Sequence, residues 1–172
     1  MLIRTTLSLI FVSVLAGCQG VQRAEFPDLD GRLSSAAQEL LQDADELEII
    51  ALHPSPHSEA GKPTDGVDDF HGYKILGRAT IGATAEQDEV IGHLYRGIID
   101  SGGIVAACFN PRHGIRATRG DETIDFVICY ECLSMQVHGP GDATENVLTT
   151  QEPGEALTEI WTRHGVTIHT GW

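Results

Sequence analysis

Apolar residues recur at helical spacing in three segments of this chain. The longest is 84–99, where they recur three and four positions apart and follow a capping box at the start of the segment. A second helix is predicted with Ser35 as its N-cap and Gln38, three residues on, as the capping-box partner. A third begins at Pro153, which suits a first helical turn, and ends at Gly165.

The remaining apolar residues alternate with polar ones, as in half-buried strands. The predicted strands are 48–52, 70–81 with an irregularity at Gly77, 104–109, 114–119, 123–129, 133–138 and a short last strand over 166–170. Helices kept apart from a run of hairpin-linked strands are typical of the α+β class. We therefore expect an antiparallel sheet of five to six strands with two to three helices packed on one face.

One hairpin register follows from its side chains. A two-residue turn at Gly120-Asp121 would place Arg116 opposite Asp125 and Ile115 opposite Phe126. Opposite charges and apolar groups then face each other, as cross-strand pairing favours. The same register places His113 opposite Ile128.

Continuing this register gathers three cysteines, Cys108, Cys129 and Cys132, at the open end of the hairpin together with Arg112 and His113. The sequence Cys-Phe-Asn-Pro-Arg-His-Gly-Ile-Arg from Cys108, followed by Ile-Cys-Tyr-Glu-Cys at 128–132, resembles a set of uncharacterised bacterial envelope proteins. The resemblance covers roughly residues 70–138 and brings no activity with it.

Three interpretations of this cysteine cluster stay open. The first is a disulfide from Cys108 to Cys129 or Cys132, with the third cysteine as a small buried apolar residue. The second is a zinc site in which Cys108, His113, Cys129 and Cys132 form a Cys3His tetrahedron. The third is thiol redox chemistry through the Cys-x-x-Cys pair, with Arg112 as the neighbouring cation. The disulfide is the interpretation we favour.

The start of the chain resembles a bacterial lipoprotein signal. Arg4 precedes an apolar stretch over 7–15, and Leu-Ala-Gly-Cys ends at Cys18. This predicts cleavage before Cys18 and acylation of its thiol by chains such as palmitate, which would anchor the protein to a membrane. The sequence thus divides into a signal peptide (1–17), a tether (18–33) and a single α+β domain (34–172).

The net charge and the predicted location of the protein limit which partners it can bind. The net charge of −14 argues against nucleic acid as a partner. Gln19 after Cys18 is typical of outer-membrane sorting in some bacteria, so we favour the outer membrane over the inner one. The protein partner is unknown, and no cofactor is predicted apart from zinc in the metal interpretation.

The predicted function is therefore a lipid-anchored, non-catalytic extracytoplasmic module that binds a partner or supports the envelope. The alternative is a zinc-binding or thiol-redox protein that acts through the cysteine cluster. Three loop histidines, His53, His57 and His71, are a weaker candidate for a metal site, because nothing in the sequence places them together.

Overall fold

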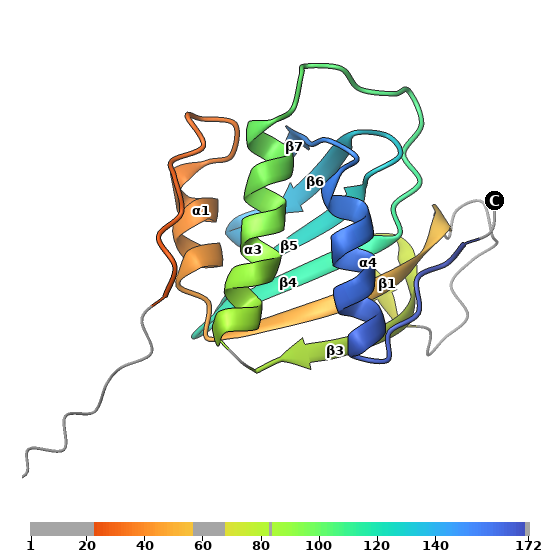
Figure 1. Ribbon diagram of the computed structural model, residues 1–172, viewed down its shortest axis with the longest axis horizontal. Helices are drawn as coiled ribbons and strands as arrows, with labels where there is room; N and C mark the ends of the chain where they lie inside the picture. The colour runs from red at the N-terminus through yellow and green to blue at the C-terminus, as the bar shows by residue number, and fades with distance from the viewer. Residues whose placement is uncertain (1–22, 57–67, 83, 171–172) are drawn as a thin grey trace, which may run out of the picture.

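The computed structural model describes residues 23–56, 68–82 and 84–170 (Figure 1). In chain order the elements are α1 (Ser35–Gln42), β1 (Glu46–Pro56), β2 (Asp69–Phe70), β3 (Tyr73–Ile81), α3 (Thr84–Ile99), β4 (His113–Arg119), β5 (Glu122–Cys129), β6 (Ser134–His138), a 3₁₀ turn (Pro140–Asp142), β7 (Thr144–Leu148) and α4 (Pro153–Arg163).

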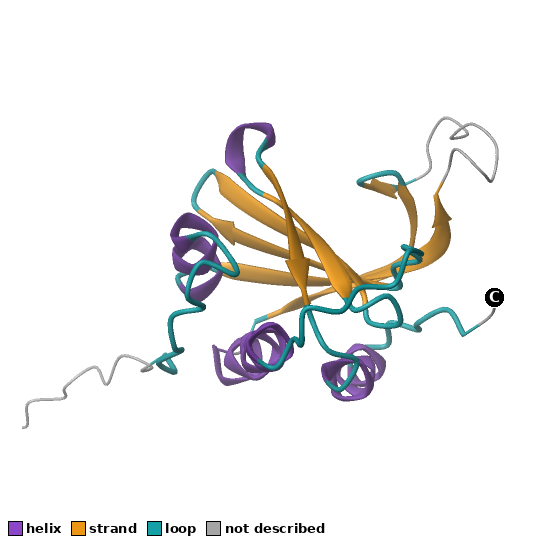
Figure 2. Ribbon diagram, turned by 90° about the horizontal axis from the view of Figure 1, so that it is seen from above, coloured by secondary structure: helices purple, strands orange, loops and turns teal. Residues whose placement is uncertain are grey.

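Seven strands form one sheet in the order β2-β3-β1-β4-β5-β6-β7, and every neighbouring pair is antiparallel. The sheet curls like half of a barrel, and α1, α3 and α4 cover one of its faces (Figure 2). The predicted α+β class is confirmed. The sheet is larger than expected for two reasons. β7, where no strand was predicted, pairs with β6, and the predicted single strand 70–81 is divided by a turn at His71 and Gly72 into the hairpin of β2 and β3.

Most of the buried apolar residues lie between the three helices and the sheet. Trp161 from α4 is fully buried there, and its indole N–H donates to the backbone carbonyl of Ile50 in β1 at 2.9 Å. A smaller cluster comprises Ile50, Leu52, Phe70, Tyr73 and Val127. Because side chains alternate along a strand, Ile50 and Val127 point away from the helix-covered face to which Ile49 and Ile128 belong.

The predicted hairpin is confirmed in its register. β4 and β5 pair Arg116 with Asp125, Ile115 with Phe126 and His113 with Ile128. Gly120 begins the turn with φ of 58°, a left-handed conformation that glycine adopts without a steric penalty. The expected irregularity at Gly77 is also present, since the register of β1 and β3 shifts beside it.

Two predicted strands are not formed. Residues 104–109 and 166–170 have no strand structure. Residues 104–109 find no free strand edge beside β5 or β6, because β5 already pairs with β4 and β6, and β6 pairs with β7. The segment 104–109 instead crosses as a loop, held by the amide of Ala106, which donates to the carbonyl of Cys132 at 3.1 Å.

The predicted start of the first helix was wrong by one residue. Ser34, not Ser35, caps α1, since its hydroxyl accepts a hydrogen bond from the amide of Ala37. Gln38 is no capping-box partner. Its buried side chain accepts from the amide of Leu29 at 3.1 Å and donates to the carbonyl of Leu33 at 2.9 Å.

The described part of the predicted tether, 23–33, packs on the domain. Leu29 and Leu33 are buried in the main core, and the side chain of Arg23 donates to that of Gln87 in α3 at 2.8 Å. The expectation that 18–33 forms a tether is therefore wrong for this part, because its two leucines complete the core beside α1. In the described ranges, no helix is long and apolar enough to cross a bilayer.

Candidate functional site

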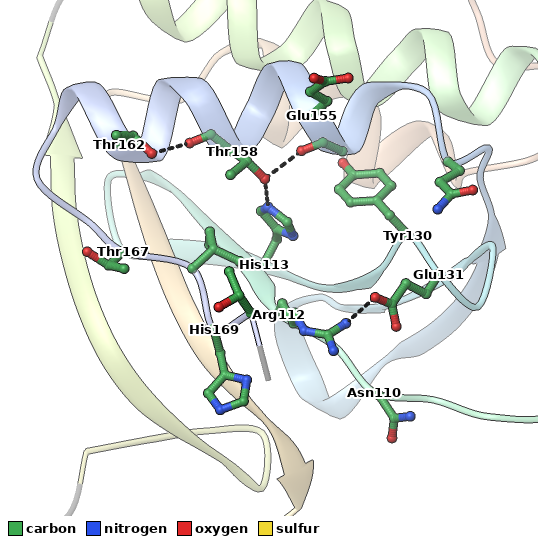
Figure 3. Close-up of a pocket in the computed structure, with 14 residues that line it drawn as sticks. Asn110, Arg112, His113, Tyr130, Glu131, Glu155, Thr158, Thr162, Thr167 and His169 are labelled. Atoms are coloured by element: carbon green, nitrogen blue, oxygen red, sulfur yellow. Dashed lines mark hydrogen bonds and ion pairs between the residues drawn. The ribbon is translucent and has the colours of Figure 1, made fainter. Parts of the chain in front are cut away.

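A pocket of about 580 Å³ opens between α4, the loop 130–131 and the segment 167–170, at the same end of the hairpin as the cysteines (Figure 3). We call it the α4 pocket. Its volume lies within the range of small-molecule sites. Most of its lining residues carry polar side chains, although more of the lining surface is apolar than polar. They are Asn110, Arg112, His113, Tyr130, Glu131, Gln151, Gly154, Glu155, Thr158, Thr162, Thr167, Ile168, His169 and Thr170.

His113 is a buried wall residue of the α4 pocket and is held in one orientation. Its Nε2 lies 2.9 Å from the hydroxyl of Thr158, which itself donates to the carbonyl of Gly154 at 2.7 Å. Since that hydroxyl has one proton and gives it to Gly154, Nε2 is the donor and Nδ1 carries no proton. Burial, together with the charge of Arg112, lowers the pKa of His113 to about 3, so the ring is neutral near pH 7.

The guanidinium of Arg112 is paired within the pocket. Its Nη1 lies 2.6 Å from a carboxylate oxygen of Glu131, and the Arg112 side chain is only 12% exposed (Figure 3). The pair largely cancels the positive charge that the pocket would otherwise present. The remaining charged side chain of the lining is Glu155, which is exposed on the first turn of α4.

Close packing sets the position of α4 over this wall. Tyr130 contacts the ring of His113, with centroids 5.3 Å apart, and lies against Gly154. A Cβ on Gly154 would come within 3.0 Å of the Tyr130 ring. A residue without a side chain is therefore needed where the first turn of α4 crosses the tyrosine.

Tyr130 and Glu131 are also the two residues between Cys129 and Cys132. These two cysteines form a disulfide, with Cα atoms 5.2 Å apart. Both are buried, whereas Cys108 is a free, exposed thiol. The Sγ atoms of Cys108 and Cys132 nevertheless lie 3.1 Å apart.

The prediction that the three cysteines gather is thus confirmed, but the predicted disulfide to Cys108 was wrong. The turn at 129–132 brings its own two cysteines close enough to pair, and this leaves Cys108 beside them. The predicted Cys3His tetrahedron is not assembled. His113 lies on the helix-covered face and donates to Thr158, because strand alternation turns it away from its neighbour Arg112.

The two loop histidines that the structure describes, His53 and His71, have different neighbours. His53 contacts His169, with ring centroids 5.0 Å apart, whereas His71 contacts Asp125. His57 lies outside the described residues. Among the residues that the structure describes, no group of three His, Cys, Asp or Glu is placed to hold a metal ion.

A second polar cluster surrounds Asp125. This carboxylate is 4% exposed and accepts two hydrogen bonds from Arg116, both of 2.7 Å, and one of 2.7 Å from Nε2 of His71. His71 stacks on His138 with centroids 3.8 Å apart. Burial alone would raise the pKa of Asp125, but these hydrogen bonds and charges outweigh it and lower the pKa.

Several lining residues of the α4 pocket were not predicted. Thr158 and Thr162 lie on the helix α4, which the sequence pattern identified only by its apolar face, and Thr167 and His169 lie in a predicted strand. No local motif marks them, since they meet only when α4 and the end of the chain pack beside 110–113. Comparisons with protein families, with curated proteins and with solved structures find no match for this chain.

Proposed function

We propose that this protein is a lipid-anchored extracytoplasmic binding module that holds a small, uncharged, hydrogen-bonding ligand in the α4 pocket. The observation that carries the proposal is the pocket itself, which has the volume of a ligand site and walls held by hydrogen bonds. The proposed lipid anchor and extracytoplasmic location rest on the Leu-Ala-Gly-Cys sequence that ends at Cys18, which lies outside the described residues.

The charges of the pocket favour a neutral ligand. Arg112 is already paired with Glu131, His113 is neutral, and Glu155 adds a negative charge at the rim. The whole chain has a net charge of −14, which repels anions. Apart from Arg112, which is paired, the lining residues that the structure describes include no arginine or lysine to bind an acidic ligand.

The remaining polar lining matches a ligand rich in hydroxyl or amide groups. Asn110, Gln151, Thr167 and Thr170 carry amides and hydroxyls that both donate and accept hydrogen bonds. An uncharged sugar offers the complementary groups, so we choose N-acetylglucosamine as the neutral probe and glucuronate as its acidic counterpart.

The test is saturation-transfer NMR of the full chain with each probe. We expect transfer to N-acetylglucosamine and little or none to glucuronate. Thr167→Trp, which adds bulk at the exposed rim, should abolish the transfer. Thr123→Trp is the matched control, because Thr123 is also exposed but lies near the turn at the other end of the hairpin.

Two results would overturn the proposal. One is stronger transfer to glucuronate than to the neutral sugar, which would contradict the charge argument. The other is the absence of transfer to both probes, or transfer that Thr167→Trp leaves unchanged, which would mean that the α4 pocket does not bind this class of ligand. The anchor is tested separately by the acylation of Cys18.

A further inference from the structure

The three cysteines form a thiol beside a disulfide, and only one of their sulfurs is accessible. Cys129 and Cys132 are 1% and 0% exposed, whereas Cys108 is exposed on the loop between α3 and β4. A thiol in solution therefore cannot reach the Cys129–Cys132 disulfide directly. The Sγ of Cys108 lies 3.1 Å from that of Cys132 and can reach it.

The backbone gives the exchange a direction. A thiolate breaks a disulfide by attacking one sulfur and expelling the other. Cys108 contacts Cys132, so the expelled sulfur is that of Cys129. The amide N–H of Cys132 already donates to the Sγ of Cys129 at 3.2 Å. A hydrogen bond of this kind strengthens when the acceptor becomes a thiolate, so the leaving group is stabilised where it forms.

We propose that Cys108 relays thiol–disulfide exchange between a thiol in solution and the buried Cys129–Cys132 disulfide. In the first step the Cys108 thiolate bonds to Cys132, the Cys129–Cys132 bond breaks, and Cys129 leaves as a thiolate. The exposed cysteine is then part of the disulfide. This step is an isomerisation, with one disulfide and one thiolate on each side.

The second step involves an external thiol. Its thiolate attacks the Sγ of Cys108, expels Cys132 as a thiolate and leaves a mixed disulfide on Cys108. A second external thiolate then attacks the outer sulfur of the mixed disulfide and regenerates the Cys108 thiolate. In sum, two external thiols become one disulfide, and their two electrons reduce the Cys129–Cys132 pair to two thiols. An external disulfide drives the same steps backwards.

The relay also acts on the α4 pocket, because Tyr130 and Glu131 lie between the two bonded cysteines and line that pocket. It does not depend on which ligand the pocket binds. The chemistry can therefore be tested without any ligand, and its failure would leave the proposed binding function standing.

The test measures the rate at which glutathione reduces the Cys129–Cys132 disulfide in the full chain. Samples are quenched with an alkylating reagent, and peptide mass spectrometry identifies each disulfide. We expect Cys108→Ser to slow the reduction by at least about tenfold, since it removes the free thiol that lies next to Cys132. Val105→Ser is the matched control on the same loop, because Val105 is 54% exposed and leaves all three sulfurs in place.

A trapping variant tests the direction independently. In Cys129→Ser, oxidised glutathione should produce a Cys108–Cys132 disulfide, the product of the first step. In Cys132→Ser, formation of a Cys108–Cys129 disulfide at a similar rate would contradict the assigned direction. Equal rates of reduction in the wild type and in Cys108→Ser would overturn the relay. So would a Cys129→Ser protein that keeps both thiols free, or a Val105→Ser control as slow as Cys108→Ser.

Discussion

Replacing Asp125 by Asn tests the polar cluster that ties the β2–β3 turn to the sheet. The carboxylate accepts three hydrogen bonds of 2.7 Å, two from Arg116 and one from His71, and it is 4% exposed. Asparagine keeps the shape but loses the charge. Its amide nitrogen also presents hydrogen atoms where the carboxylate oxygen accepted them.

The structure sets the size of the effect. Breaking a fully buried ion pair costs about 3–5 kcal/mol because the remaining charge is left unpaired. The Arg116 side chain is 38% exposed, so water compensates part of this loss. We therefore expect Asp125→Asn to lower the free energy of unfolding by about 2–3 kcal/mol at pH 7, which corresponds to a melting temperature lower by about 4–12 °C.

The dependence on pH gives a second readout. The pKa of Asp125 in the fold lies below its usual value of 3.8, so its contribution is complete above that value and is lost as the pH falls through the lower, folded pKa. The difference between wild type and Asp125→Asn should therefore shrink below about pH 4. Burial lowers the pKa of His113 to about 3, so its protonation in acid destabilises the wild type and the variant alike. This effect therefore cancels in the difference between the two proteins.

Urea unfolding at pH 7 and pH 3, followed by circular dichroism, measures both quantities. Glu122→Gln is the control on the same hairpin, because the Arg119–Glu122 pair is exposed to solvent and should contribute little. The reasoning is refuted if Asp125→Asn differs from the wild type by less than about 0.5 kcal/mol at pH 7. It is also refuted if the difference is as large at pH 3 as at pH 7.

Three further changes test other parts of the molecule. Gly154→Ala should destabilise the fold by about 1–3 kcal/mol in urea unfolding, because its Cβ would lie 3.0 Å from the Tyr130 ring; Gly102→Ala, where no atom lies within 4 Å, should have little effect. Cys18→Ala should abolish uptake of a fatty-acid label, and a wild-type protein without label would contradict the predicted anchor. Reducing the Cys129–Cys132 disulfide should lower stability by about 2 kcal/mol, the value for so short a loop, whereas a melting temperature lowered by a chelator would indicate a metal instead.

Local patterns in the sequence were sufficient for most of the fold. Helical spacing predicted α3, and Pro153 with Gly165 predicted the limits of α4, because a helix depends on residues three and four positions apart. The β4–β5 hairpin followed from charge and apolar matches across a two-residue turn. These features are local. The hairpin brings its own open end to the cysteines at 129 and 132, and the loop 104–109, held by the amide of Ala106 on the carbonyl of Cys132, then places Cys108 beside Cys132, 24 positions away.

The tertiary structure decided which cysteines form the disulfide and which residues from distant segments come into contact. The sequence placed three cysteines together, but the turn at 129–132 decided which two are bonded and which one stays exposed. His71 and Asp125, 54 positions apart, meet because the β2–β3 turn folds over the sheet, and no local pattern encodes that contact. The α4 pocket likewise exists only once α4 and 167–170 lie beside the hairpin end, since packing between distant segments creates the space that a ligand could fill.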